Sequence, residues 1–255
     1  MSKLVLSLLV TALSLGALPV NAGRVIERDL VSIHVVDAAS LRQLPTYNQE
    51  NLVWVQGTPN EAYSLRLSNN SDTRVLAVLS VDGVNVITGK TASPSQSGYV
   101  IGPRDHVYIK GWRKSMDSVA EFKFGSVESS YAALTGRPDN LGVIGVAAFQ
   151  EDVPSPILHK DIVQNSAPYG MAKRHSAAPS SLAGADRAAE LGTQHGRKLR
   201  DSASYTEFQR VPGQSPAVST VYYDSRRGLI SRGVIPTPQR HRPNPFPDGF
   251  VPDPY

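Results

Sequence analysis

Apolar and polar residues alternate with a period of two through much of residues 29–149, and no other feature restricts the fold as strongly. In residues 61–67 this alternation would place Tyr63, Leu65 and Leu67 on one face of a strand. Successive side chains of a β-strand point to opposite faces of the sheet, so a period of two predicts strands that are buried on one side. The nearly continuous apolar run at 143–149 instead predicts a central strand that is buried on both sides.

Nine short strands follow from this pattern, and residues typical of turns separate them. We expect the strands at 30–36, 52–55, 61–67, 74–81, 84–87, 98–101, 106–109, 119–124 and 143–149. Asp82-Gly83 is a dipeptide typical of the tight turn between two antiparallel strands. Within residues 29–149, only residues 129–134 indicate a helical turn. The pattern therefore predicts a mainly β protein, an antiparallel β-sandwich of the Ig-like or jelly-roll-like kind.

The first 22 residues have the layout of a secretory signal peptide. Lys3 supplies a positive start, residues 4–18 are largely apolar, and Val20-Asn21-Ala22 ends the run. The run is too short, and too rich in Ser, Thr and Gly, for a typical membrane span. We therefore expect cleavage after Ala22 and a periplasmic or secreted protein. We expect no transmembrane segment in the mature chain, since no later apolar stretch is long enough.

The chain contains no cysteine, which excludes disulfide bonds, thiolate zinc sites and iron–sulfur clusters. None of the six histidines stands in a spacing typical of metal ligands. The sequence also lacks a Gly-x-Ser-x-Gly nucleophile motif and a glycine-rich phosphate loop before a helix. It thus indicates neither a metal nor another cofactor.

The sequence changes in character after Gln150. Residues 23–150 would form the sandwich domain. The segments that follow are a flexible linker at 151–190, a small basic β segment at 191–235 and a disordered Pro-rich tail at 236–255.

Within these C-terminal segments we expect a few short elements. They are a short helix at 181–191 and strands at 206–211, 218–224 and 229–235. The sequence leaves open whether the strands after Thr206 join the main sheets or form a separate module. It carries no indication of oligomeric state.

Charge is distributed unevenly along the chain. Residues 23–150 carry 12 basic and 12 acidic side chains, whereas residues 191–242 carry 9 basic and 3 acidic ones. Such a basic region could meet anionic lipid headgroups, an envelope polysaccharide or an acidic envelope protein. The alternative is an ordinary solvated surface. Nucleic acid is not an expected partner, because the β half is neutral and the chain is expected to be exported.

Two stretches contain residue types that are enriched at binding sites. Trp112 and Arg113 lie among basic residues at the end of a predicted strand, and Arg137, Asp139 and Asn140 lie in a loop dense in turn formers. Trp and Arg are the residues most enriched at binding hot spots. If they meet in space, these side chains could hold a carbohydrate, an anionic group or a partner's side chain. The alternative is that Trp112 covers one end of the core while Arg113 is solvated.

His195 is the candidate among the histidines. Gly192 and Gly196 flank it, and such glycines would let a ligand approach the backbone closely. The alternative is a surface loop between a helix and a strand. If the protein is an enzyme, His195 or a carboxylate such as Asp139 is the candidate general base of a hydrolase.

Several segments together resemble a group of secreted proteins from Gram-negative bacteria that have no assigned activity. The segments that carry the resemblance are Tyr63–Asn69, Ser80–Gly89, Gln96–Val100, Gly111–Ser115, Thr135–Ala147, Leu191–Gly196 and Tyr223–Ser225. The resemblance covers residues 60–150 well and 190–235 weakly. It implies an exported β protein and transfers no catalytic residue.

These observations favour a secreted, non-catalytic binding or structural protein of the bacterial cell envelope. Two alternatives remain open at this point. One is a hydrolase that acts on envelope polymers, and the other is a subunit of an exported multiprotein assembly.

Overall fold

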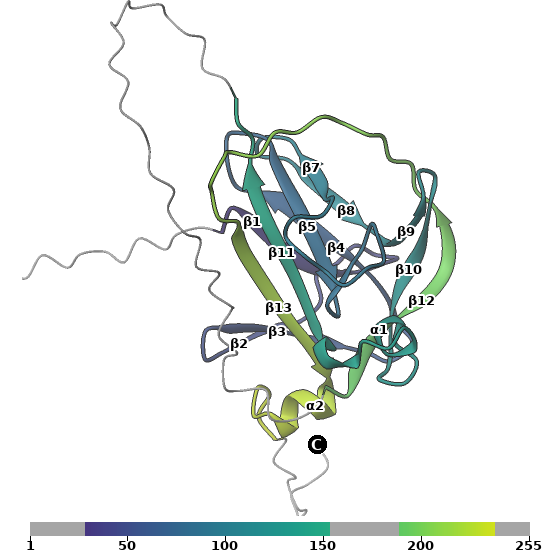
Figure 1. The fold of residues 1–255 in the computed structure, drawn as a ribbon. Helices are drawn as coiled ribbons and strands as arrows, with labels where there is room; N and C mark the ends of the chain where they lie inside the picture. Colours follow the sequence, from purple (N-terminus) through teal and green to yellow (C-terminus); the bar gives the residue numbers. More distant parts are fainter. Residues whose placement is uncertain (1–28, 154–188, 238–255) are drawn as a thin grey trace, which may run out of the picture.

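The computed structural model describes residues 29–153 and 189–237, which form two facing β-sheets (Figure 1). The expectation of a mainly β protein with a sandwich architecture is confirmed. One strand pair, β3 with β13, is parallel, and every other pair in the two sheets is antiparallel.

The first sheet follows the order β1-β4-β10-β12. Two further strands pair at its sides, β8 with β4 and β9 with β10. Its strands are β1 (Val31–Asp37), β4 (Ala62–Asn69), β8 (His106–Ile109), β9 (Gly111–Ser115), β10 (Ser118–Ser126) and β12 (Leu191–Arg200).

The second sheet follows the order β2-β3-β13-β11-β5-β6, and β7 pairs with β5. Its strands are β2 (Thr46–Gln49), β3 (Leu52–Gly57), β5 (Val75–Val81), β6 (Val84–Asn85), β7 (Tyr99–Ile101), β11 (Val143–Gln150) and β13 (Ala217–Ser225). Three short helical elements complete the described fold. They are α1 (Tyr131–Leu134), α2 (Arg226–Ser231) and a 3-10 helix at Pro138–Asn140.

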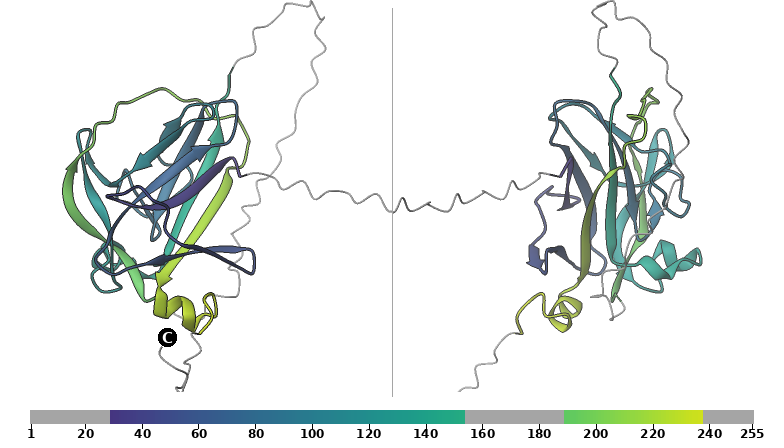
Figure 2. Two further views of the ribbon diagram at one scale, coloured as in Figure 1. Left: turned by 180° about the vertical axis from the view of Figure 1, so that it is seen from behind. Right: turned by 60° about the vertical axis from the view of Figure 1, so that its left-hand side comes forward.

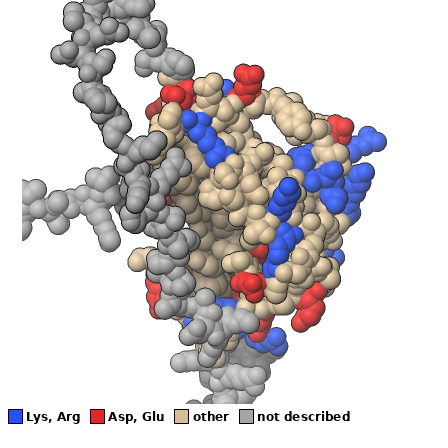
Figure 3. All heavy atoms as spheres, in the orientation of Figure 1, with Lys and Arg blue, Asp and Glu red and all other residues tan. Residues whose placement is uncertain are grey.

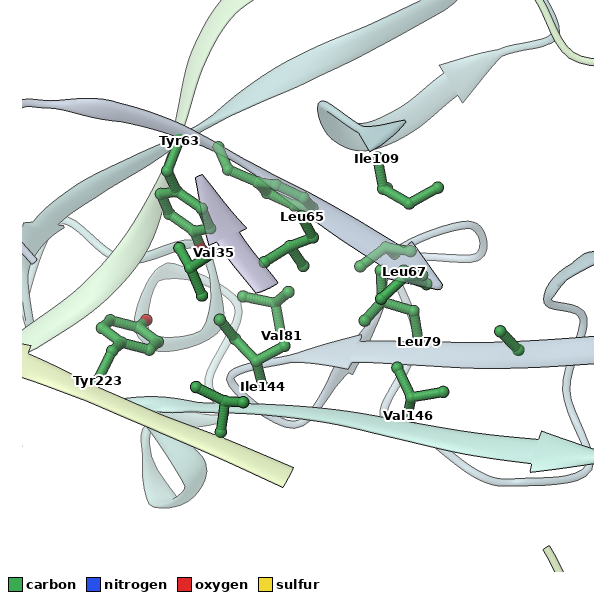
Figure 4. Close-up of a cluster of buried hydrophobic side chains, with 14 of the residues drawn as sticks. Val35, Tyr63, Leu65, Leu67, Leu79, Val81, Ile109, Ile144, Val146 and Tyr223 are labelled. Carbon is green, nitrogen blue, oxygen red and sulfur yellow. The ribbon is translucent and has the colours of Figure 1, made fainter. Parts of the chain in front are cut away.

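The core lies between the sheets, where inward side chains of both meet (Figure 4). Leu65 and Leu67 of β4 face Ile144 and Val146 of β11, and all four are almost completely buried. The alternation seen in the sequence thus separates a core face from an outer face along β4. Burying one such aliphatic side chain stabilises the fold by about 1.5–3 kcal/mol.

A buried polar network crosses the core and connects the two sheets. The Asp82 carboxylate is 1% exposed and accepts hydrogen bonds from the Tyr223 hydroxyl at 2.7 Å, the Thr193 amide at 2.7 Å and the Gly142 amide at 3.0 Å. The Thr193 hydroxyl also bonds both the Tyr223 hydroxyl and the Tyr63 hydroxyl. Burial raises the pKa of Asp82 to about 6, although these donors oppose the shift. Asp82 does stand in the expected turn, but its side chain also connects β12 of the first sheet to the second sheet.

Both C-terminal strands belong to the sandwich. The expected strand at 218–224 is present as β13, which lies between β3 and β11 in the second sheet. Residues 191–200 form β12 of the first sheet, so the expectation of a helix end and surface loop there is wrong. Residues 191–225 therefore complete the two sheets, which answers the question that the sequence left open.

Two further expectations for the C-terminal region are wrong. Residues 206–211 form no strand and pair only through the isolated bridge of Arg210 with Glu151. The strand expected at 229–235 is absent. Helix α2 covers residues 226–231 and a turn follows it, since the Ser225 hydroxyl caps the helix by accepting from the Gly228 amide at 2.9 Å. Figure 2 shows α2 at one end of the sandwich and residues 201–216 crossing the opposite end.

Some expectations concern residues outside those that the structure describes. They are the signal peptide at 1–22, most of the linker at 151–190 and most of the tail at 236–255. Within the described residues, none of the helices has the length and apolar character that crossing a membrane requires.

Candidate functional site

Trp112, Tyr131 and His195 form an aromatic cluster where β9, α1 and β12 meet. The Tyr131 and His195 rings are stacked, with centroids 4.3 Å apart and planes 18° apart. The Trp112 ring lies 5.0 Å from Tyr131 and 5.9 Å from His195. The Arg137 guanidinium lies 5.9 Å from the Tyr131 ring centroid. The structure therefore brings together three of the residues expected from the sequence, and Tyr131 is the residue that connects them.

Local structure fixes each member of this aromatic cluster. His195 pairs directly with Phe122 of β10, and Trp112 pairs with Ala120 of the same strand. Helix α1 is capped by the Ser130 hydroxyl, which accepts from the Ala133 amide at 3.2 Å. A side chain at Gly192 would come within 2.5 Å of Ser130, so glycine is needed for β12 to approach α1 closely.

Trp112 is 3% exposed and packs edge-on against Phe122, so it covers this end of the core. The alternative prediction is therefore correct for Trp112 but wrong for Arg113, whose side chain is only 10% exposed rather than solvated. The Trp112 indole N–H is buried without a hydrogen-bond partner among the described residues. Arg137 is held by its own loop and by the segment after β6, since its guanidinium donates to the Thr135 hydroxyl at 2.7 Å and to the Gly89 carbonyl at 3.1 Å. Neither Trp112 nor Arg137 is free to reorient toward a ligand.

The remaining candidates lie elsewhere. Arg113 points away from Trp112 along β9, forms an ion pair with Asp201 and donates to the Tyr99 hydroxyl at 3.5 Å. Asp139 and Asn140 are exposed in the 3-10 helix, and no hydrogen bond or ion pair joins them to the aromatic cluster. The meeting of Trp112 with Arg113 that the sequence suggested does not occur.

Exposed cations lie along the second half of β12 and at the end of β9, near the aromatic cluster. We call Lys114, Arg197, Lys198 and Arg200 the basic ribbon, and all four are exposed. Figure 3 shows Lys and Arg gathered on the side of the molecule where β9, β10 and β12 lie in Figure 1. Arg197 pairs with Glu121, whereas no ion pair joins the other three to any described carboxylate. Sequence composition indicated a basic region, but only the sheet brings Lys114 of β9 to the same end of the sheet as β12, with β10 between the two strands.

The basic ribbon borders two hollows. The first, which we call the Glu121 hollow, has a volume of about 510 Å³ and is lined by Asn60, Ala62, Glu121, Lys123, Gln194, His195, Gly196 and Arg197. The second has a volume of about 460 Å³ and is lined by Ser115, Asp117, Ser118, Lys198, Leu199, Arg200 and Ser202. Both are shallow and polar, and both include consecutive residues of β12.

The far edge of β12 carries no paired strand among the described residues, since β12 ends the order of the first sheet. The pairing register shifts between Ala120 and Phe122, where β12 has one more residue than β10. Such a bulge increases local twist, and charged residues on an edge discourage pairing with another sheet. The edge is therefore suited to present side chains rather than to add a strand.

His195 is placed for contact rather than for proton transfer. One face of its ring is covered by Tyr131, and burial together with the nearby Lys114 charge lowers its pKa. No described carboxylate forms a hydrogen bond with the ring, so no group in that part of the chain would orient it as a base. The described residues also contain no group of three side chains able to hold a metal ion.

Comparison with protein families, with curated proteins and with solved structures finds no match for this chain. The case for a function therefore depends on the geometry of the basic ribbon, the two hollows and the aromatic cluster.

Proposed function

We propose that the protein is an exported, non-catalytic binding protein of the bacterial cell envelope that holds an anionic polymer along its basic ribbon. One observation carries this proposal. Lys114 at the end of β9 and Lys198 and Arg200 on β12 are exposed, and none of the three has an ion-pair partner among the described residues. Cations arranged in this way attract anions and are not committed to holding the fold.

A polymer fits this surface better than a small anion does. An exposed ion pair contributes only about 0–1 kcal/mol, so a single anionic group would bind weakly. A polymer presents many such groups at high local concentration, and the contacts reinforce one another. The interaction would weaken as salt rises, because the charges are exposed to solvent.

The chemistry of the surface favours a polysaccharide over a protein partner. Protein interfaces have an apolar centre that is depleted of charge. The basic ribbon and its hollows instead present amides, hydroxyls and charged groups, and Leu199 is the one large apolar residue among the described residues that line the hollows. Hydroxyl-rich anions match such a lining.

The hydrolase alternative has less support. A glycosidase needs two carboxyl groups that face one substrate. Glu121 is the one carboxylate among the described residues that line its hollow, and it is paired with Arg197. The bacterial envelope as the location is supported by the signal-like N-terminus and by the resemblance to secreted proteins of Gram-negative bacteria.

The test is the affinity of the chain from Gly23 onward for alginate, a polyuronate, measured by titration calorimetry at two salt concentrations. The double variant Lys198→Glu/Arg200→Glu should lower the affinity by about tenfold or more, since it removes two contacts and adds repulsion. Arg42→Glu/Arg226→Glu is the matched control, because both residues are exposed, lie off the basic ribbon and change the net charge equally. An equal loss in both double variants would contradict a localised surface.

A further inference from the structure

The Glu121 hollow lies on the outer face of the first sheet. Ala62 pairs with Lys123, and Lys123 pairs with Gln194, so these three side chains form a row across β4, β10 and β12. Their neighbours Phe122 and Thr193 face the core instead. Side chains alternate along each strand, so the row must point away from the core. Glu121 and Arg197 extend it toward the basic ribbon.

The Glu121 carboxylate is held in a fixed position in this hollow. Its side chain is 6% exposed, and it accepts hydrogen bonds from Arg197 Nε at 3.2 Å and Nη2 at 3.3 Å. A side chain at Gly196 would come within 3.0 Å of Glu121, so the glycine in the bulge makes room for the carboxylate. An ionised carboxylate offers about four acceptor positions. The bonds from Arg197 account for two of them, which leaves acceptor capacity toward the hollow.

The lining of the hollow combines hydroxyl-binding and anion-binding groups. The Glu121 carboxylate and the amides of Asn60 and Gln194 can bond hydroxyl groups, and Lys123 and Arg197 can bond an acidic group. Its volume of about 510 Å³ lies within the range of about 300–1,000 Å³ that is typical of small-ligand sites.

We propose that the Glu121 hollow is a subsite for one sugar unit and that the polymer is an acidic polysaccharide, a polyuronate being the simplest example. This inference rests on the proposed function of the basic ribbon and names the ligand class. The buried Glu121 carboxylate favours a polymer that carries hydroxyl groups over a polymer of phosphate groups alone. A hydroxyl group can donate to Glu121, whereas a polymer of phosphate groups alone would bring like charge toward it without a donor.

The subsite and the basic ribbon lie within reach of one extended chain. From Gln194 to Arg200 the strand spans about 20 Å, at about 3.3 Å per residue. Lys198 and Arg200 pair with Ala120 and Ser118, so they leave β12 on the opposite face from Gln194. A chain of several sugar units could fill the Glu121 hollow and contact Lys198 and Arg200 by crossing the edge of β12 that carries no paired strand among the described residues. The affinity for oligosaccharides should rise with their length until one chain occupies both the Glu121 hollow and the basic ribbon.

The experiment compares alginate with inorganic polyphosphate as probes of the chain from Gly23 onward. Glu121→Gln and Asn60→Gly should each lower affinity for alginate by about five- to tenfold and leave affinity for polyphosphate unchanged or higher. Asn60 has a φ of +70°, a conformation that glycine adopts freely, so this substitution removes the amide without strain. It keeps the test valid if Glu121→Gln unfolds the protein.

The outcomes separate the two proposals. If neither variant lowers alginate affinity while Lys198→Glu/Arg200→Glu does, the sugar subsite is wrong and the basic ribbon stands. Equal losses for both polymers in Asn60→Gly would also overturn the subsite. If neither polymer binds the unaltered chain, the proposed function itself fails.

Discussion

Asp82→Asn should remove a distinct part of the pH dependence of folding stability. The Asp82 carboxylate is buried between the sheets and keeps its proton in the folded state up to a pKa of about 6, against 3.8 when unperturbed. Asparagine has nearly the same shape but cannot ionise. The amide also replaces one acceptor oxygen with a donor, which lowers stability by a similar amount at every pH. The pH-dependent part of the difference therefore reports the free energy of burying the charge.

The sign follows from proton binding in the two states. Between pH 3.8 and about 6 the folded protein retains a proton on Asp82 that the unfolded chain has released. Stability therefore falls as pH rises through this window, and it is highest, for this group, below pH 3.8. The two pKa values correspond to about 3 kcal/mol of unfolding free energy. Asp82→Asn should lack this decline.

The assay is urea unfolding between pH 4.5 and 7.5, followed by the fluorescence of the two tryptophans, both of which are buried. Other titratable groups also contribute to the pH dependence, among them His34 and His195, and burial lowers the pKa of both. They are present in both proteins, so the difference between the two stability curves reports Asp82. The difference should change by about 2 kcal/mol across the measured range. Parallel curves would refute the reasoning.

Two further predictions concern the fold. A chain ending at Gln150 lacks β12 and the central strand β13, so it should show no cooperative thermal transition by circular dichroism, and a sharp transition would contradict this. Trp112→Ala should lower the unfolding free energy in urea by about 3–5 kcal/mol, because it empties a buried site. His195→Ala, on the exposed side of the same aromatic cluster, should cost about 1 kcal/mol or less, and similar losses in both would contradict the assignment of Trp112 to the core.

The sequence predicted the strands whose two faces differ in environment. In β4, β5, β10 and β11 the apolar residues lie where a core face requires them, and the pattern is visible without the structure. The continuous apolar run of β11 predicted burial on both sides, but buried and half-buried positions alternate along most of this strand. β9 and β12 were missed because Gly111–Ser115 and Leu191–Arg200 contain glycines and charged residues on exposed faces. Their pairing depends on β10, which is distant in the sequence.

The site was predictable only in part, for a similar reason. The residue types at Trp112, Arg137 and His195 drew attention to them, and the fold brings them together. Tyr131 carried a weaker signal, its place in the expected helical turn. Glu121 carried none, since it occupies a polar position of an alternating strand. Its burial follows from the bulge at Gly196, which sequence periodicity does not reveal.

The most direct test of the central claim, that β12 carries the binding surface, is amide hydrogen exchange of the chain from Gly23 onward with and without saturating alginate. The account predicts slower exchange at residues 194–200 and at 112–115, with little change elsewhere in the described residues. Protection confined to β2, β3 and α2, at the far end of the second sheet, would contradict it, as would a saturated complex with no protection along β12.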